Sequence, residues 1–476
     1  MQTLVRPLHQ GVKSALQDVT PTRLRLLVFL NCFCAILFAF AAVTTVQQHH
    51  HAVQTVGVDA APSVIAASEI KIGVEMMDTD LAEDLLYTPG QQEALDVEQD
   101  FEKWRTLVSK QLVIAAKNIT YGKTEQVPIE NIQVALGQYL MQVQNVRDLH
   151  KAQEDAEALP AYRKSLETVK TLLLPAADAL NKANADVLET IYAEEKSATN
   201  LSRGFVLLTG LILIAVLMYT QIFLSVRFRR RINLPMLITT ICVALFLQKL
   251  GTALGDNSRF LKVAKEDSYN SIFSLLNARA DAYAANAAQS RWLLDSNRAE
   301  IYEKEFADKA GLVARFDRGH DFKETLARAR NQLANNEALN LPGLSGSMAD
   351  ELANARFPGE AQAAMQALES FGDFCDLESK MRDMKSSAER RYAMLLYLGY
   401  RPSQSKYAFS KFDDALERTL QINQDQLQHS VDEALHNLDG LSVGAQLIAL
   451  LAVISTCLGL LPRIEEYVHC SPKPRH

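Results

Sequence analysis

The sequence predicts an all-α protein with four transmembrane helices and two extracytoplasmic antiparallel four-helix bundles arranged as a tandem repeat. Three observations support this fold. Four stretches are apolar over about 20 residues each, the length that a helix needs to cross a bilayer. The two long segments between them are rich in Ala, Leu, Gln, Glu and Lys, which favour helices. The second half of the chain also repeats the plan of the first.

The central pair of apolar stretches predicts the topology. Residues 205–226 and 234–254 are separated only by the short loop 227–233. The arginines of this loop are Arg227, Arg229, Arg230 and Arg231. A short arginine-rich loop stays on the cytoplasmic side, so the segments joined to the outer ends of both spans face away from the cytoplasm. A buried hairpin in a soluble core is the weaker alternative, because such helices rarely contain so long an apolar run.

The two remaining apolar stretches complete the order along the chain. The first is longer than the apolar core of a signal peptide, which favours a retained span. Basic residues flank the cytoplasmic ends, so we expect a multi-pass protein of a bacterial inner (plasma) membrane with both termini cytoplasmic. The predicted parts are the N-terminus 1–25, span 26–46, bundle 47–204, span 205–226, loop 227–233, span 234–254, bundle 255–442, span 443–461 and tail 462–476.

The first outer segment predicts four helices. One continues from the membrane to about Leu86 and ends at the turn 87–90, where Pro and Gly stop the pattern. The other helices are expected at 91–118, at 129–156 and from Pro160 back into the membrane. Pro175 lies within the last of them and predicts a kink, because proline removes one helical hydrogen bond.

The second outer segment repeats this plan. A helix runs from the third span to Leu294, and a turn and a helix at 298–314 follow. A Gly-containing insert at 340–346 interrupts the pattern, and long helices are expected at 359–399 and 405–441. The two halves therefore resemble a duplicated unit of span, bundle and span.

Composition and motifs exclude several classes of function. A net charge of −7 gives no general affinity for nucleic acid. No Walker loop, GxSxG, HExxH or strand-linked GxGxxG occurs, so we expect no enzyme and no cofactor. A transporter is disfavoured because the spans contain almost no charge.

For two groups of polar residues the sequence favours a solvated position over a functional site. The histidines at 49–51 point about 100° apart on a helix, which favours a solvated interfacial turn over a metal site. The pattern also predicts a solvated helix surface, rather than acid–base pairs, for Asp78, Asp80, Glu83 and Asp84.

Arg279 and Asn286 recur at heptad-like spacing along the helix after the third span, which predicts a place near the bundle seam. Setting the register or pairing within the bundle is the favoured role for them. Binding of a small carboxylate ligand by the guanidinium is the second role, and partner contact is the third.

The predicted cytoplasmic parts are small, so any signal must pass to a separate protein. The four loop arginines are expected to set topology and contact anionic lipid first, with docking of an acidic partner second. The tail near Tyr467 is the other candidate contact with a cytoplasmic partner or lipid.

Several stretches resemble the GlnX-like four-span membrane proteins. The most specific is KEDSYNSIFSLLNARADAYAANAAQSRWLL (265–294), and shorter ones are TPTRLRLL (20–27), LLPAADAL (173–180), RFRRRINLPML (227–237), YEKEF (302–306) and LGLLPRIEEY (458–467). The resemblance implies a non-enzymatic sensor or adaptor. It would work with a periplasmic amino-acid-binding lipoprotein of the GlnH type and a cytoplasmic PknG-type Ser/Thr kinase, reporting external aspartate or glutamate.

Other interpretations stay open at this point. A structural or assembly subunit of a membrane complex is the alternative function. The sequence leaves the direct ligand and the oligomeric state open, a homodimer included, and the resemblance supplies no ligand residues.

Overall fold

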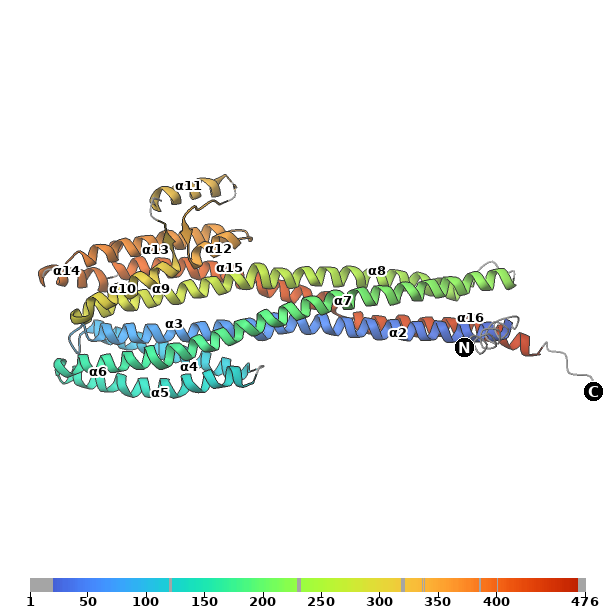
Figure 1. The fold of residues 1–476 in the computed structure, drawn as a ribbon, viewed down its shortest axis with the longest axis horizontal. Coiled ribbons are helices and arrows are strands. Elements are labelled where there is room, and N and C mark those ends of the chain that lie inside the picture. Colours follow the sequence, from blue (N-terminus) through green and yellow to red (C-terminus); the bar gives the residue numbers. More distant parts are fainter. Residues whose placement is uncertain are drawn as a thin grey trace, which may run out of the picture. The chain divides into compact units, whose positions relative to one another are not determined.

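The computed structural model describes residues 20–119, 122–228, 233–317, 322–335, 337, 339–384, 387–399 and 401–469. This part of the chain is almost entirely helical, which confirms the all-α prediction (Figure 1). Its contacts divide it into two compact units. The apolar unit comprises the residues up to Val53, Tyr192–Leu261 and those from Asp432 onward, and the large unit comprises Gln54–Ile191 and Lys262–Val431.

The apolar unit contains the predicted spans. Its helices are α2 (Thr20–Gln54), the second part of α7 (Leu174–Phe228), α8 (Leu234–Lys262) and α16 (Leu441–His469). Apolar side chains such as Phe38 and Leu213 are fully buried between these helices. Others, such as Phe29 and Leu458, are about two-thirds exposed. An exposed apolar surface of this kind is suited to contact with lipid rather than water.

Four helical runs in the described part of the chain are long and apolar enough to cross a membrane. They are Thr22–Asp84, Asp155–Val226, Leu234–Leu294 and Ser405–Glu465. Each run also contains residues of the large unit. The fourth run turns at Asp439–Gly440, where Gly440 has a φ of +73°, a value that glycine adopts without strain.

The first segment of the large unit has the helix order that the sequence predicts. Its elements are η1 (Thr55–Ala60), α3 (Ala61–Asp84), α4 (Gln92–Lys117), α5 (Lys123–Lys151), α6 (Asp155–Thr168) and η2 (Val169–Leu173), followed by the start of α7. The π-helical turn η2 ends two residues before Pro175. Its wider turn compensates for the helical hydrogen bond that this proline cannot donate.

The second segment is more divided than predicted. Its elements are η3 (Val263–Tyr269), α9 (Asn270–Leu294), η4 (Ser296–Arg298), α10 (Ala299–Val313), β1 (Arg315–Phe316), α11 (Phe322–Ala334), β2 (Leu344–Ser345), α12 (Ser347–Asn354), α13 (Glu360–Arg382), α14 (Ser387–Leu398) and α15 (Ser405–Leu438). The helix expected at 359–399 is wrong as a single element, because α13 ends at Arg382. The two strands pair antiparallel, with Arg315 opposite Ser345.

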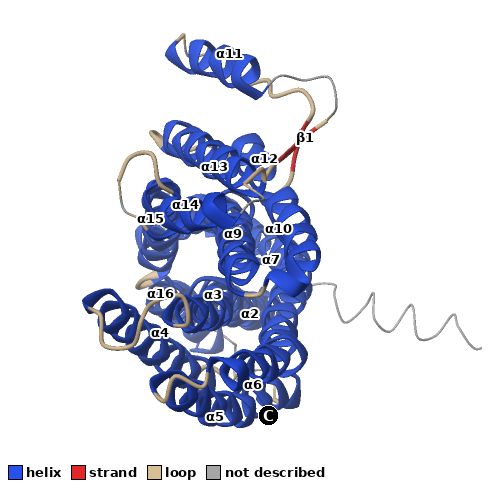
Figure 2. Cartoon of the chain, turned by 90° about the vertical axis from the view of Figure 1, so that its left-hand side faces the viewer, coloured by secondary structure: helices blue, strands red, loops and turns tan. Residues whose placement is uncertain are grey.

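The two segments share one hydrophobic core within the large unit. Helices α3 and α9 pack against each other, with α4 to α6 on the α3 side and α10, α13 and α15 on the α9 side (Figures 1 and 2). The core joins Tyr139 and Tyr162 of the first segment to Trp292, Tyr302 and Tyr397 of the second. The residues predicted as two bundles therefore fold around a common interior.

The two segments also enter the large unit in the same way. In each, a membrane-length helix passes through a π-helical turn, η1 or η3, into a long helix of the unit, α3 or α9. Both long helices end at a turn before the next helix begins, which is the internal repeat expected from the sequence.

A buried pair of carboxyl groups joins α12 to α13. Glu351 and Glu360 are both fully buried. Glu360 accepts hydrogen bonds from the backbone N–H groups of Arg356 (2.6 Å) and Phe357 (2.8 Å) and from Asn423 (2.7 Å). Burial and the neighbouring Glu360 raise the pKa of Glu351 to about 8.

This pair predicts a pH-dependent stability. The folded state keeps the proton of Glu351 that the unfolded chain releases near its ordinary value of 4.5, so stability is lost as the pH rises from there through about 8. Between pH 5 and pH 9 the free energy of unfolding should fall in both proteins. The fall in the Glu351→Gln variant should be smaller than in the wild type by on the order of 2 kcal/mol. Unfolding of the full chain in detergent at both pH values measures this, with Glu300→Gln on exposed α10 as the matched control. Equal losses in all three proteins would contradict the assignment.

Candidate functional site

The acidic residues of α3 lie inside the large unit. Asp78 is fully buried, Asp80 and Glu83 are 4% and 2% exposed, and Asp84 is 9% exposed. The solvated surface expected for these four residues is therefore wrong. Helix α3 packs against both α4 and α9, so little of its circumference reaches water. Buried carboxylates need cationic or hydrogen-bonding partners, and most of these partners come from the second segment.

The first partner is Arg291 of α9, which is fully buried. Its guanidinium donates to Asp78 (Nε–Oδ2, 2.8 Å) and to Glu75 (Nη2–Oε2, 3.0 Å). The same group donates to Glu305 of α10 (Nη1–Oε1, 2.8 Å). Burial raises the pKa of Glu75 although Arg291 opposes this shift. One cation thus connects three acids on two helices in the middle of the core.

The second partner is Lys406 of α15, which forms an ion pair with Glu83. The other oxygen of Glu83 accepts a hydrogen bond of 2.6 Å from the hydroxyl group of Tyr397. Glu83 is therefore held from both α14 and α15, the two helices before and after the last turn of the second segment.

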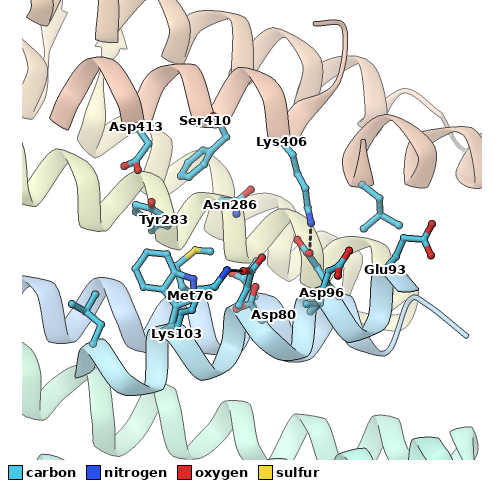
Figure 3. A pocket seen from close by; sticks show the side chains of 18 of the residues that line it. Met76, Asp80, Glu93, Asp96, Lys103, Tyr283, Asn286, Lys406, Ser410 and Asp413 are labelled. Carbon is cyan, nitrogen blue, oxygen red and sulfur yellow. Dashed lines mark hydrogen bonds and ion pairs between the residues drawn. The ribbon is translucent and has the colours of Figure 1, made fainter. Parts of the chain in front are cut away.

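A pocket opens beside this ion pair, lined by α3 and α4 of the first segment and by α9 and α15 of the second (Figure 3). Its volume is about 670 Å³, which is in the range of small-molecule sites. We call it the acidic pocket after its carboxylates, Asp80, Glu83, Glu93, Asp96, Asp100, Asp413 and Asp414. Two lysines, Lys103 and Lys406, also line it. Carboxylates therefore outnumber the cations of the wall.

Asp80, like Glu83, is a buried acid of this pocket. Its Oδ2 atom has no hydrogen-bond partner among the residues that the structure describes. Burial raises the pKa of Asp80 well above its ordinary value, and the charge of Glu83 adds to the shift while Lys406 opposes it. By contrast, Glu93, Asp96 and Asp414 are exposed at the rim.

Aromatic rings form the apolar part of the pocket. Trp104 of α4 meets Tyr283 of α9 edge to face, with ring centroids 6.0 Å apart. Tyr283 meets Phe409 of α15 in the same manner at 4.9 Å. These rings give the pocket rigid walls at the place where both segments meet.

The structure places the two predicted seam residues in different surroundings. Arg279 forms ion pairs with Asp413 (2.9 Å), Glu417 (2.8 Å) and Glu69 (3.4 Å). Asn286, two helical turns further along α9, lines the acidic pocket and is 6% exposed. Arg279 pairs with acids of α15 in its own segment, which is the pairing within the bundle that the sequence favours. Asn286 instead faces a cavity.

The other sequence candidates lie elsewhere. Arg229, Arg230 and Arg231 are outside the described residues, and of Arg227 and Tyr467 only the helical backbone is described. His49 is in helix α2 rather than in a turn, and it is buried with Nδ1 3.1 Å from Asn257 Oδ1. In the described part of the chain, no three His, Cys, Asp or Glu residues come together as a metal site.

Sequence reasoning missed the acidic pocket because its residues come from distant parts of the chain. The ion pair between Glu83 and Lys406 spans 323 residues. One signal was present in the sequence. Helix α3 combines six acids with many small and apolar residues but only one lysine, Lys71, so its carboxylates have to find their partners on other helices.

Comparison with known proteins assigns a class to the first segment. Residues 52–193 match the family model described as Actinobacterial sensor domain. The match begins just before η1 and ends within α7, so it covers α3 and α4 of the acidic pocket but not α9 or α15. No curated protein and no solved structure matches the chain. With its four membrane-length apolar helices, the chain is a multi-pass membrane protein of the sensor type.

The buried network predicts a large cost for removing its cation. Replacing Arg291 with Met leaves Glu75, Asp78 and Glu305 without their shared partner, and we expect a loss of about 3–5 kcal/mol. Thermal unfolding of the detergent-solubilised full chain measures this loss. Arg401→Met, at an exposed position, should change stability by less than about 0.5 kcal/mol. Combining Arg291→Met with Glu75→Gln and Asp78→Asn should recover part of the loss. A variant Arg291→Met as stable as the control would show that the network does not hold the core.

Proposed function

We propose that this protein is a non-catalytic transmembrane sensor or adaptor. It relays extracytoplasmic amino-acid status, that of aspartate or glutamate, through a binding lipoprotein to a cytoplasmic Ser/Thr kinase. The sensor-domain match supports the sensing role. The resemblance to GlnX-like proteins is the ground for the two partners and for the amino acids.

The observation that carries the relay is the continuity of the helices. Three of the four membrane-length runs contribute residues to the acidic pocket: Asp80 from the first, Tyr283 and Asn286 from the third, and Lys406 from the fourth. A change in how these helices pack around the pocket is therefore transmitted along the same helices to the spans. Helices of this kind move as rigid bodies by small shifts or rotations, which is a known way to carry a signal.

The π-helical turns give each helix a place to adjust. Within their runs, η1 lies between the first span and α3, and η3 lies between the third span and α9. Such turns contain one extra residue per turn and are frequent at functional sites. In the proposed relay, a change of register at η1 or η3 alters the rotation of the span that precedes it.

The charge of the pocket bears on where the amino acid binds. A dicarboxylate would meet Asp80 and the exposed acids Glu93, Asp96 and Asp414 and be repelled. The proposal therefore assigns recognition of aspartate or glutamate to the separate binding lipoprotein. That protein would dock on the outer face and bias the packing of the bundle.

The orientation can be tested directly. In a cysteine-free background, a cysteine at Gln138, which is exposed on α5, should react with a membrane-impermeant maleimide in intact cells. A cysteine at Arg230 should react only after lysis, because the arginine loop is expected inside. The reverse pattern would place the large unit in the cytosol and exclude the proposed relay.

The partners can be tested by co-purification. The tagged full chain, solubilised in mild detergent, should recover a solute-binding lipoprotein and a Ser/Thr kinase. Addition of aspartate or glutamate should change the amount of at least one of them. Recovery of neither would contradict the proposal. Stable recovery of an enzyme complex that no amino acid affects would favour the alternative role of an assembly subunit.

A further inference from the structure

We propose that the acidic pocket binds a small organic cation, an alkylammonium or alkylguanidinium, as a direct ligand of this protein. The binding site is argued from the pocket alone. Only its consequence, that the cation modulates the signal, rests on the proposed function.

Acidic side chains outnumber basic ones in the wall of the pocket. Seven carboxylates and two lysines line the pocket. Both lysines already have acidic partners, since Lys103 pairs with Asp100 at 2.7 Å and Lys406 pairs with Glu83. A third acid of the wall, Asp413, pairs with Arg279 at 2.9 Å. The carboxylates that remain are those of Asp80, Glu93, Asp96 and Asp414, and they produce a negative potential that attracts a cation and rejects an anion.

Asp80 is a buried acid with a carboxyl oxygen that is unpaired among the described residues. It is 96% buried, it lines the pocket, and its Oδ2 atom lacks a hydrogen-bond partner in the described part of the chain. A buried carboxyl oxygen without a partner destabilises the folded protein. An N–H donor of a bound ammonium or guanidinium would supply both a hydrogen bond and an opposite charge to this carboxyl group.

Three aromatic side chains form another part of the pocket wall. Trp104, Tyr283 and Phe409 surround the apolar side of the pocket (Figure 3 labels Tyr283). Ring faces attract cations through their quadrupole, most strongly in a site shielded from water. They also accept the methylene groups that accompany an organic ammonium or guanidinium. The acids of the pocket therefore suit the cationic group of such a ligand, and the rings suit its methylene groups.

The same features disfavour an inorganic ion. Calcium needs six to eight oxygen ligands around one point, and magnesium needs an octahedral set. Among the described residues, the acids of this pocket do not converge as a metal site. Aromatic rings would also contribute nothing to the coordination of either ion. An organic cation is therefore the class of ligand that the pocket fits.

The position of the site gives the ligand an effect on the fold. A cation bound to Asp80 and close to Asp413 would attract α3 towards α15, across the place where the two segments meet. Since both helices belong to membrane-length runs, occupancy of the pocket would favour one packing of the spans over another.

Binding can be measured by calorimetry on the purified full chain in detergent. The probes are 1,4-diaminobutane, spermidine and arginine. The neutral 1,4-butanediol, glutamate, Ca²⁺ and Mg²⁺ serve as comparison solutes. At least one of the cationic probes should bind with saturation and raise the unfolding temperature, whereas the diol, glutamate and the metal ions should not.

Two variants locate the site. Asp80→Asn should weaken binding of the cationic probe at least tenfold, and it should fold well because it removes a buried charge. Trp104→Leu should weaken binding at least threefold through loss of the ring while keeping every acid. Asp308→Asn, an identical change at an exposed position of α10 outside the pocket, should bind like the wild type.

Three results would overturn the proposal. The first is that none of the cationic probes binds. The second is that affinity is the same in Asp80→Asn as in Asp308→Asn. The third is that Ca²⁺, Mg²⁺ or glutamate binds the pocket as tightly as the organic cations. The relay is judged separately, since recovery of the two partners fails or succeeds whether or not a cation binds.

Discussion

The structure of the large unit depends on neutralising the acids of α3. This helix places Glu75, Asp78, Asp80 and Glu83 in a core where an unpaired carboxylate is costly. The cations that compensate them, Arg291 and Lys406, come from the second segment. The first segment therefore cannot bury α3 by itself. Electrostatics, in addition to apolar packing, joins the two repeats into one compact unit.

The compensation is uneven along α3, and the acidic pocket lies where it is incomplete. At Asp78 the guanidinium of Arg291 and the hydroxyl group of Tyr162 both donate to Oδ2, so this acid has a cationic partner although its Oδ1 atom lacks a hydrogen bond among the described residues. One turn or less further along, Asp80 lacks a partner at Oδ2, and the surrounding wall is rich in acids. Proteins retain such locally unfavourable groups mainly where function requires them, at the expense of stability.

Helical continuity connects this interior to the spans. The runs Thr22–Asp84 and Leu234–Leu294 each include a membrane-length apolar stretch, a π-helical turn and residues that contact the buried acids or line the pocket. In the proposed relay, a ligand or partner that prefers one packing of α3 against α9 acts on the spans through these two helices, provided that its affinity for the two packings differs.

The sequence by itself determined the features that depend on local patterns. The apolar lengths predict the four spans, and the turns after about Leu86 and after Leu294 predict the ends of the helices that the structure ends at Asp84 and Leu294. Pro175 predicts a kink, and the structure has the π-helical turn η2 just before it. These features follow from side-chain periodicity and backbone chemistry within a few turns of helix.

Only the tertiary structure decided which polar residues are buried and what they contact. Asp78 and Arg291 are 213 residues apart, and no local pattern distinguishes their pairing from solvated charges on a helix surface. The same holds for Asn286, which has the spacing of a seam residue but lines a cavity. The reason is physical: burial of a charge depends on the potential from all neighbouring helices, and that potential exists only after distant segments have packed.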